Sequence, residues 1–208
     1  ETTKADVYIN GELYDSYTFP FVGDHLLLNV LGVITVCYLE NLPKDVVRKQ
    51  VSVIEHAKRR FIEEKFRNNI LIDDYAHHPT EVKVTIEAAR KKYPDREIVA
   101  LFKAHTRSRV QYFHKEFADA LNLADKAFVL DIGEDRKENG YDGVSCMDII
   151  KDLKNGEYIS LEEVDKLLPY KDTNAVLLFM SSKDIYVLQN KFKEIACKYF
   201  YYKDIGCK

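Results

Sequence analysis

The fold of this 208-residue chain is constrained most by a regular alternation that begins after the basic cluster at residues 58–60. Short apolar runs, each about the length of a β-strand, alternate with segments whose apolar residues recur at helical spacing. Continuous apolar strands separated by amphipathic helices predict a doubly wound, mostly parallel α/β sheet. The strands are expected at 69–73, 97–102, 126–131, 158–160 and 175–180, and the helices at 79–93, 108–124, 147–153, 161–168 and 185–199.

The segment before this alternation has a different pattern. Apolar residues alternate with polar ones on both sides of Asn10-Gly11, a dipeptide that favours the tight turn of a β-hairpin because both positions tolerate a positive φ. Two helices should follow the hairpin. The hairpin strands are expected at 6–9 and 13–19, and the helices at 24–40 and 44–56.

A hairpin and two helices are too little for a complete domain. The chain also begins at Glu1, in strand-like sequence and without a methionine. We therefore expect residues 1–66 to be the C-terminal part of a larger domain whose first part lies upstream. Residues 67–208 have the usual size of one domain and are expected to form a complete α/β unit.

Composition excludes several classes of protein. The 31 basic and 34 acidic residues give a net charge of -3, so no basic excess favours a nucleic-acid partner. The longest apolar stretch is shorter than the about 20 residues that span a bilayer, and no signal peptide is recognisable. Four scattered cysteines without a Cys-x-x-Cys spacing are typical of a reducing compartment, so the expected location is the cytoplasm.

Polar residues gather in loops that follow three of the expected strands. These loops lie at 73–81, 103–109 and 181–184. Ligands of parallel α/β sheets bind beyond the carboxyl ends of the strands, where such loops lie at one edge of the sheet. The sequence therefore predicts a functional site on this edge.

The first loop has two interpretations. Its paired aspartates and histidines, with His78 and Glu81 three residues apart, have side chains that ligate metals. Alternatively, Asp74 caps a turn, Thr80 and Glu81 satisfy the first turn of the next helix, and a histidine packs against Tyr75. The second interpretation is the more usual fate of such residues, and we expect no metal site. The position of the loop favours contact with a ribose hydroxyl or a substrate amine.

The second loop is suited to an anion. His105, Arg107 and Arg109 lie at the start of a helix, where backbone N–H groups and guanidinium groups both attract negative charge. The alternative is that each arginine pairs with a surface acid. The basic cluster at 58–60 has the same two interpretations, a solvated helix end or an arginine that reaches a phosphate.

The chain lacks both glycine-rich phosphate-binding motifs, so it does not encode a phosphate cradle of its own. His25 and Asn29, four residues apart at a helix start, suit either an amide contact with a purine edge or capping and packing. None of the cysteines lies in a motif typical of a nucleophile.

The run Asp-Asp-Tyr-Ala-His-His-Pro-Thr-Glu at 73–81 carries a family resemblance. Together with Arg-Arg-Phe at 59–61, His-Thr at 105–106 and Ser-Arg at 108–109, it resembles the C-terminal half of the Mur ligases, in particular the branch that joins L-alanine to UDP-N-acetylmuramate. The resemblance covers nearly the whole chain. It implies a Rossmann-like C-terminal domain, preceded here by the tail of the central ATP-binding domain.

The resemblance also implies partners and residue roles. ATP and Mg²⁺ would serve the full-length enzyme, in which an acyl phosphate forms on the muramate carboxylate and is attacked by the alanine amine. The 208-residue chain would hold neither ATP nor Mg²⁺ fully, and without the other half of the polypeptide it should be inactive. The residues implied at the nucleotide are Asn29, Arg60 and Asp74, and those implied at the amino acid are His77, His105 and Arg109.

Two alternatives stay open at this point. A murein peptide recycling ligase shares the run at 73–81, although the residues at 105–109 are closer to those of the alanine-adding branch. A relative without catalytic activity, kept as a binding module, would share the same fold. No residue of this chain is assigned a catalytic role.

Overall fold

The computed structural model describes residues 2–20, 24–54, 59–133 and 139–205, and leaves the side chains of 24, 25 and 199–205 undescribed. The chain divides into two compact units, Glu1–Ala57 and Lys58–Lys208. The sequence had placed this boundary after residue 66. The difference arises because the segment just before 67 is a strand of the second unit's sheet.

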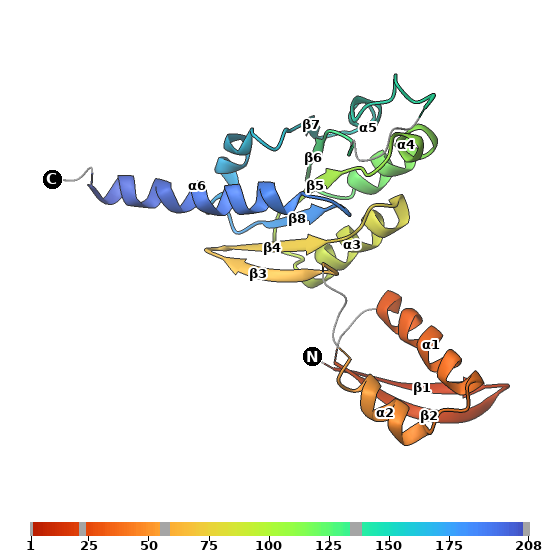
Figure 1. The fold of residues 1–208 in the computed structure, drawn as a ribbon. Coiled ribbons are helices and arrows are strands. Elements are labelled where there is room, and N and C mark those ends of the chain that lie inside the picture. The colour runs from red at the N-terminus through yellow and green to blue at the C-terminus, as the bar shows by residue number, and fades with distance from the viewer. Residues whose placement is uncertain (1, 21–23, 55–58, 134–138, 206–208) are drawn as a thin grey trace. The chain divides into compact units, whose positions relative to one another are not determined.

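The first unit contains the expected hairpin and two helices (Figure 1). Asn10 and Gly11 have φ values of 53° and 86°, as the tight turn requires. Helix α2 ends before the expected position, and residues 52–54 continue as turn and coil. The elements are β1 (Thr3–Ile9), β2 (Glu12–Phe19), α1 (Asp24–Leu39) and α2 (Lys44–Val51).

Apolar side chains from all four elements form the core of the first unit. Tyr17 and Phe19 of β2 are each 2% exposed and pack with Val30 and Ile34 of α1. Other apolar side chains of α1 are exposed, including Leu28 at 68% and Leu39 at 67%. The core therefore uses only one face of a helix that is apolar on several.

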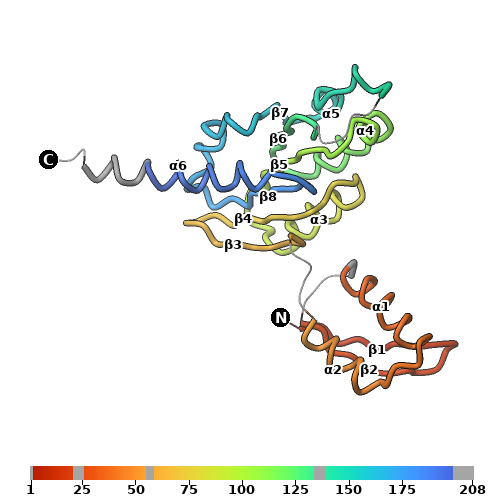
Figure 2. The backbone as a smooth tube through the Cα atoms, viewed as in Figure 1, coloured from red at the N-terminus to blue at the C-terminus, as the bar shows by residue number. Residues whose placement is uncertain are grey.

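The second unit is built on a six-stranded sheet with the order β3-β4-β8-β5-β6-β7. All neighbours are parallel except β3 and β4, which are antiparallel. The backbone trace in Figure 2 shows β8 between β4 and β5, although β8 comes last in the chain. The strands are β3 (Ile62–Phe66), β4 (Asn69–Asp74), β5 (Ile98–Lys103), β6 (Lys126–Leu130), β7 (Gly156–Tyr158) and β8 (Val176–Met180).

Helices cover both faces of this sheet, which confirms the doubly wound α/β prediction (Figure 1). One face packs against α3, α4 and α5, and the other against the 3₁₀ helix η1 and α6. Where a helix was expected at 161–168, the chain forms the 3₁₀ helix. The helices are α3 (Pro79–Lys92), α4 (Arg107–Leu121), α5 (Met147–Ile150), η1 (Val164–Tyr170) and α6 (Tyr186–Ile205).

A buried asparagine fixes the amino ends of two neighbouring strands, β4 and β8. Asn69 is 0% exposed, and its amide nitrogen donates to the carbonyl of Tyr170 at 2.6 Å. Its amide oxygen accepts from the backbone N–H of Ala175 at 2.9 Å. Because Ala175 immediately precedes β8, these bonds align the starts of β4 and β8 and thereby their carboxyl ends.

We predict that Phe102→Ala strongly destabilises the second unit. The Phe102 ring is fully buried and lies 4.9 Å from the Phe117 ring, so truncation leaves a cavity between the sheet and α4. The expected loss is about 3–5 kcal/mol of unfolding free energy, measured by urea denaturation. Tyr112→Ala, at a residue that is 68% exposed on the same helix, is the control and should cost about 0.5 kcal/mol or less. Equal losses would contradict this packing.

Candidate functional site

The three polar loops meet at the carboxyl edge of the sheet, as the sequence predicts. The Ser181 backbone N–H donates to the carbonyl of Asp74 at 3.0 Å, and the Ser181 hydroxyl donates to the carbonyl of Lys103 at 3.0 Å. The Lys103 ammonium forms an ion pair with Asp184 at 2.7 Å. The loop after β8 is therefore bonded to the loops after both neighbouring strands.

Asp74 joins the end of β4 to the segment that leads into β3. Asp74 is 6% exposed, and its carboxylate accepts from the backbone N–H groups of Ala76 at 2.7 Å and Phe61 at 2.8 Å. Burial raises the pKa of Asp74, and the two backbone hydrogen bonds oppose this shift. The backbone N–H of Tyr75 donates to the carbonyl of Arg59 at 2.7 Å. These contacts hold Arg59 and Phe61 at φ values of 60° and 51°, a region that non-glycine residues seldom occupy.

The two arginines before β3 have different surroundings. The Arg59 guanidinium binds the Asp73 carboxylate at 3.0 Å and the carbonyl of Ser181 at 2.9 Å, so it is tied to the protein. Arg60 faces Glu81 at the longer distance of 3.6 Å, and its side chain is 38% exposed. Arg60 is therefore the arginine more available to a ligand. The third member of the basic cluster, Lys58, lies outside the described residues.

His78 caps helix α3. Its backbone is extended, its Nδ1 accepts from the backbone N–H of Thr80 at 3.4 Å, and Glu81 accepts from the His78 backbone N–H at 3.1 Å. This is the capping interpretation of the first loop, and the edge-to-face contact of His77 with Tyr75 at 5.1 Å completes it. Within the described part of the chain, no group of three His, Cys, Asp or Glu side chains is placed to hold a metal ion.

The three residues implied at the amino-acid end lie together. The rings of His77, after β4, and His105, after β5, have centroids 6.1 Å apart. The Arg109 guanidinium donates to the carbonyl of His77 at 3.1 Å. Helix α4 begins beside them and is capped by Thr106, whose side chain accepts from the Arg109 backbone N–H at 3.4 Å. Two imidazoles and a guanidinium thus converge at the start of a helix.

The residues implied at the nucleotide belong to different units. Arg60 and Asp74 both lie beside the loop that follows β4 in the second unit. Asn29 lies in α1 of the first unit, where it is exposed. Their roles at a nucleotide stay predictions.

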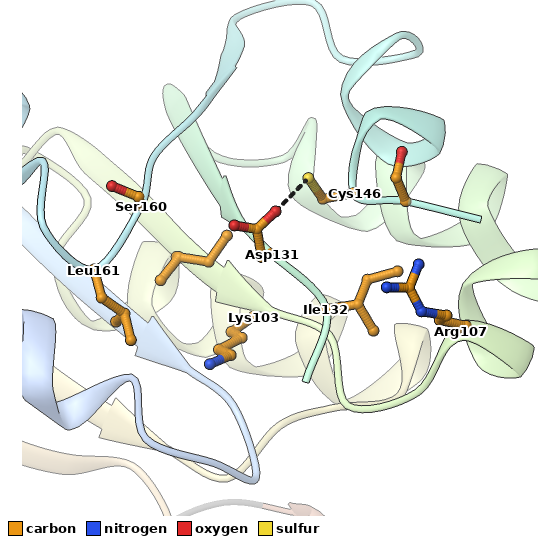
Figure 3. Close-up of a pocket in the computed structure, with 9 residues that line it drawn as sticks. Lys103, Arg107, Asp131, Ile132, Cys146, Ser160 and Leu161 are labelled. Atoms are coloured by element: carbon orange, nitrogen blue, oxygen red, sulfur yellow. Dashed lines mark hydrogen bonds between the residues drawn. The ribbon is translucent and has the colours of Figure 1, made fainter. Parts of the chain in front are cut away.

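A pocket of about 470 Å³ opens at the same edge, beyond β5 and β6 (Figure 3). It is lined by charged side chains, Lys103, Arg107 and Asp131, and by smaller groups that include Cys146 and Ser160. Arg107 belongs to a polar loop that the sequence predicts, whereas the contribution of the residues after β6 was not predicted. Asp131 directly follows an apolar strand, the same signal that identified the first loop, and could have been found in this way.

Two hydrogen bonds hold the Asp131 carboxylate, one of the groups that line the pocket. The Asp131 carboxylate accepts from the Tyr158 hydroxyl at 2.6 Å and from the Cys146 thiol at 3.8 Å. The bond to Asp131 and burial raise the pKa of Tyr158 to about 12, while burial and Asp131 raise the pKa of Cys146 to about 11. Both groups are protonated at neutral pH, so Cys146 lacks the thiolate that a nucleophile needs.

Known proteins share this architecture. A family model described as the glutamate ligase domain of the Mur ligases matches residues 59–183. UDP-N-acetylmuramate-alanine ligase MurC from Thermotoga maritima is 25% identical, with a TM-score of 0.65, over 94% of this chain and 43% of that chain. The murein peptide ligase Mpl from Psychrobacter arcticus is 18% identical, with a TM-score of 0.69, over 88% and 39%. MurF ligase from Thermotoga maritima, solved in complex with ADP, is 17% identical, with a TM-score of 0.61, over 95% and 47%.

The family model covers more than half of the chain, and the chain therefore belongs to the Mur ligase family. Its second unit has the α/β fold of the C-terminal domain of these ligases. The chain spans less than half the length of each of the three solved structures. Among the helices that the structure describes, none is both long and apolar enough to cross a bilayer.

We predict that Asp74→Asn destabilises the second unit by about 1–3 kcal/mol at neutral pH, measured by urea denaturation. An asparagine has one acceptor oxygen, so one of the two backbone N–H groups loses its partner. The pKa of Asp74 is raised on folding, so its contribution is fully present below the unfolded pKa and is lost as pH rises through the folded pKa. The difference between wild type and variant should therefore narrow with rising pH.

The matched control is Asp95→Asn, at an exposed position between α3 and β5. It should change stability by about 0.5 kcal/mol or less. A loss at Asp74 no larger than this would show that the two backbone bonds do not hold the loop. A difference that widens as pH rises would show that these bonds lower the pKa of Asp74 by more than burial raises it, contrary to the expected direction.

Proposed function

We propose that this chain supplies the amino-acid side of the active site of an ATP-dependent ligase that joins L-alanine to UDP-N-acetylmuramate in the cytoplasm. The observation that carries the proposal is the convergence of His77, His105 and Arg109 at the carboxyl edge of the sheet. Family membership supports the amide-forming chemistry, and the 25% identity to an alanine-adding enzyme over most of the chain supports the amino acid.

The reaction requires two bond changes. ATP would supply a phosphoryl group that activates the muramate carboxylate as an acyl phosphate. The amine nitrogen of alanine then forms the C–N bond while the C–O bond to phosphate breaks. An amino acid at neutral pH carries an ammonium group, so it must lose a proton before its nitrogen can attack. The protein must therefore bind a carboxylate, orient an amine and accept a proton.

The side chains at the edge match these tasks. Arg109 is suited to the alanine carboxylate, because a guanidinium binds a carboxylate through two parallel hydrogen bonds. Its bond to the His77 carbonyl leaves further N–H donors for such a ligand. The start of α4, a helix of 15 residues, adds partial positive charge at the same place. His77 and His105 are the neighbouring groups that can accept a proton.

The nucleotide end is proposed from Asn29, Arg60 and Asp74. Each oxygen of the Asp74 carboxylate uses one lone pair for a backbone N–H and keeps another for a ribose hydroxyl. Arg60 is exposed enough to meet a phosphate. We propose that Mg²⁺ is held by the rest of a longer polypeptide, without which this chain should not hydrolyse ATP; in the described part of the chain, no group of three His, Cys, Asp or Glu side chains is placed to hold a metal ion.

The function is tested by assaying phosphate release with UDP-N-acetylmuramate, ATP and a panel of acceptors. The enzyme should be the polypeptide that joins this chain to the regions its relatives possess. L-alanine should be the best free amino acid. Efficient use of a tripeptide with no use of L-alanine would instead favour the murein peptide ligases, one of which has a similar fold. No activity with any acceptor would overturn the proposal and favour a binding module.

We predict that Arg109→Ala raises the KM for L-alanine about 10-fold or more, because a charge-assisted contact to the carboxylate is lost. The KM for ATP should change much less. Steady-state kinetics with each substrate varied in turn measures both constants. Arg96→Ala is the control, because Arg96 lies before β5 at the opposite edge and bonds the carbonyl of Asn68. Equal increases in both constants would remove Arg109 from the amino-acid site.

A further inference from the structure

His77 is held by hydrogen bonds to its main chain and to its ring. Its backbone N–H donates to Glu81 Oε2 at 2.9 Å, and its carbonyl accepts from Arg109 at 3.1 Å. Ring atom Nδ1 lies 2.9 Å from the carbonyl oxygen of Tyr75 and 3.2 Å from Glu81 Oε2. The main chain of His77 is therefore held by α3 and α4, and its ring is held by Tyr75 of the same loop and by Glu81 of α3.

These contacts define where the ring carries its proton. A carbonyl oxygen and an ionised carboxylate only accept hydrogen bonds, so Nδ1 must be the protonated nitrogen. In the neutral ring, Nε2 then has a free lone pair and points away from these two acceptors. Within the described residues, Nε2 is not hydrogen-bonded, and the side chain is 21% exposed. A neighbouring ligand could reach this nitrogen.

Glu81 is built to stay ionised as the acceptor. Burial raises its pKa, but hydrogen bonds from the backbones of His77 and His78, the charge of Arg60 and, when its ring is protonated, the charge of His77 outweigh burial, so the pKa of Glu81 is lowered overall. Its other oxygen faces Arg60 at 3.6 Å. At neutral pH the carboxylate therefore keeps a negative charge beside Nδ1.

We propose that Glu81 is a positioning residue that holds His77 in the Nδ1-protonated form, so that Nε2 accepts the proton of the amino substrate. This inference rests on the proposed ligase function. The N–H bond of the ammonium breaks, the proton moves to Nε2, and the freed lone pair of the amine forms the C–N bond as the C–O bond to phosphate breaks. The attacking nitrogen loses its second proton to the departing phosphate, so that a neutral amide forms. The resulting imidazolium keeps its Nδ1–H on Glu81 and Tyr75, and it later releases the added proton to water.

The arrangement favours His77 over its neighbour for this role. His78 uses its Nδ1 lone pair to cap α3, so its ring serves the helix. The general logic is that of a base whose second nitrogen is oriented by a carboxylate. The charged and titratable groups around His77 are Tyr75 of the same loop, Glu81 of α3, Arg60 before β3, His105 after β5 and Arg109 of α4.

The test is the tautomer of His77, read from the ¹⁵N chemical shifts of its ring nitrogens in this 208-residue chain at a pH where the ring is neutral. Wild type should show a protonated Nδ1 and a free Nε2. Glu81→Gln keeps a side chain that can cap α3 but removes the charge, so a mixture with protonated Nε2 should appear. Glu87→Gln, on the exposed face of the same helix, should leave the tautomer unchanged.

Kinetics of the active polypeptide provide the second readout. Glu81→Gln should lower kcat about 10-fold or more, as expected for partial loss of general-base catalysis, with little change in the KM for ATP. A protonated Nε2 in wild type, or an unchanged tautomer or kcat in Glu81→Gln, would overturn the proposal. Because the tautomer is measured without substrate, a wild type that forms no amide would overturn the proposed function and leave the role of Glu81 in orienting His77 measurable.

Discussion

The arrangement of the second unit depends on the insertion of β8 between β4 and β5. Met180, the last residue of β8, lies opposite Asp74 of β4 on one side and Phe102 of β5 on the other. The three strands are parallel and end at nearly the same level, so the polar loops that follow them must lie side by side. Strand β8, which is the last strand in the chain, thereby brings together two loops that α3 and β5 separate in sequence.

Polar side chains at this edge form hydrogen bonds with main-chain groups of the neighbouring loops. Asp74 and Glu81 both bind main-chain N–H groups, and Arg59 and Arg109 both bind main-chain carbonyls. Such bonds hold each loop in one conformation, which is the preorganisation that a binding or catalytic site needs. In this site structural and functional roles do not exclude each other, because a carboxylate or guanidinium has more hydrogen-bonding positions than one backbone group uses.

The sequence was sufficient for the parts of the fold that follow local chemistry. The Asn10-Gly11 turn, the apolar strands and the helix that begins at Pro79 were all predicted and are confirmed. Strand β3 was missed because Ile62–Phe66 is a mostly exposed edge strand with two glutamates and no apolar run. Its omission displaced the predicted boundary between the units.

Long-range contacts limited the prediction of the site. The sequence identified the three polar loops and the residues His77, His105 and Arg109, but no local pattern gives the strand order that brings them together. The positive φ values of Arg59 and Phe61 also had no signal, because non-glycine residues adopt them here only through bonds to the loop after β4. The choice between metal binding and helix capping for the first loop depends on the contacts of His78, which the sequence does not give.

The central claim is that an amino acid binds at the carboxyl edge of β4 and β5. Titration of the ¹⁵N-labelled chain with L-alanine, followed by amide chemical shifts, tests this claim directly. The account predicts concentration-dependent shifts at His77, His105 and Arg109, and none at the amino edge around Asn69 and Arg96. Shifts confined to the amino edge, or to the first unit, would contradict it.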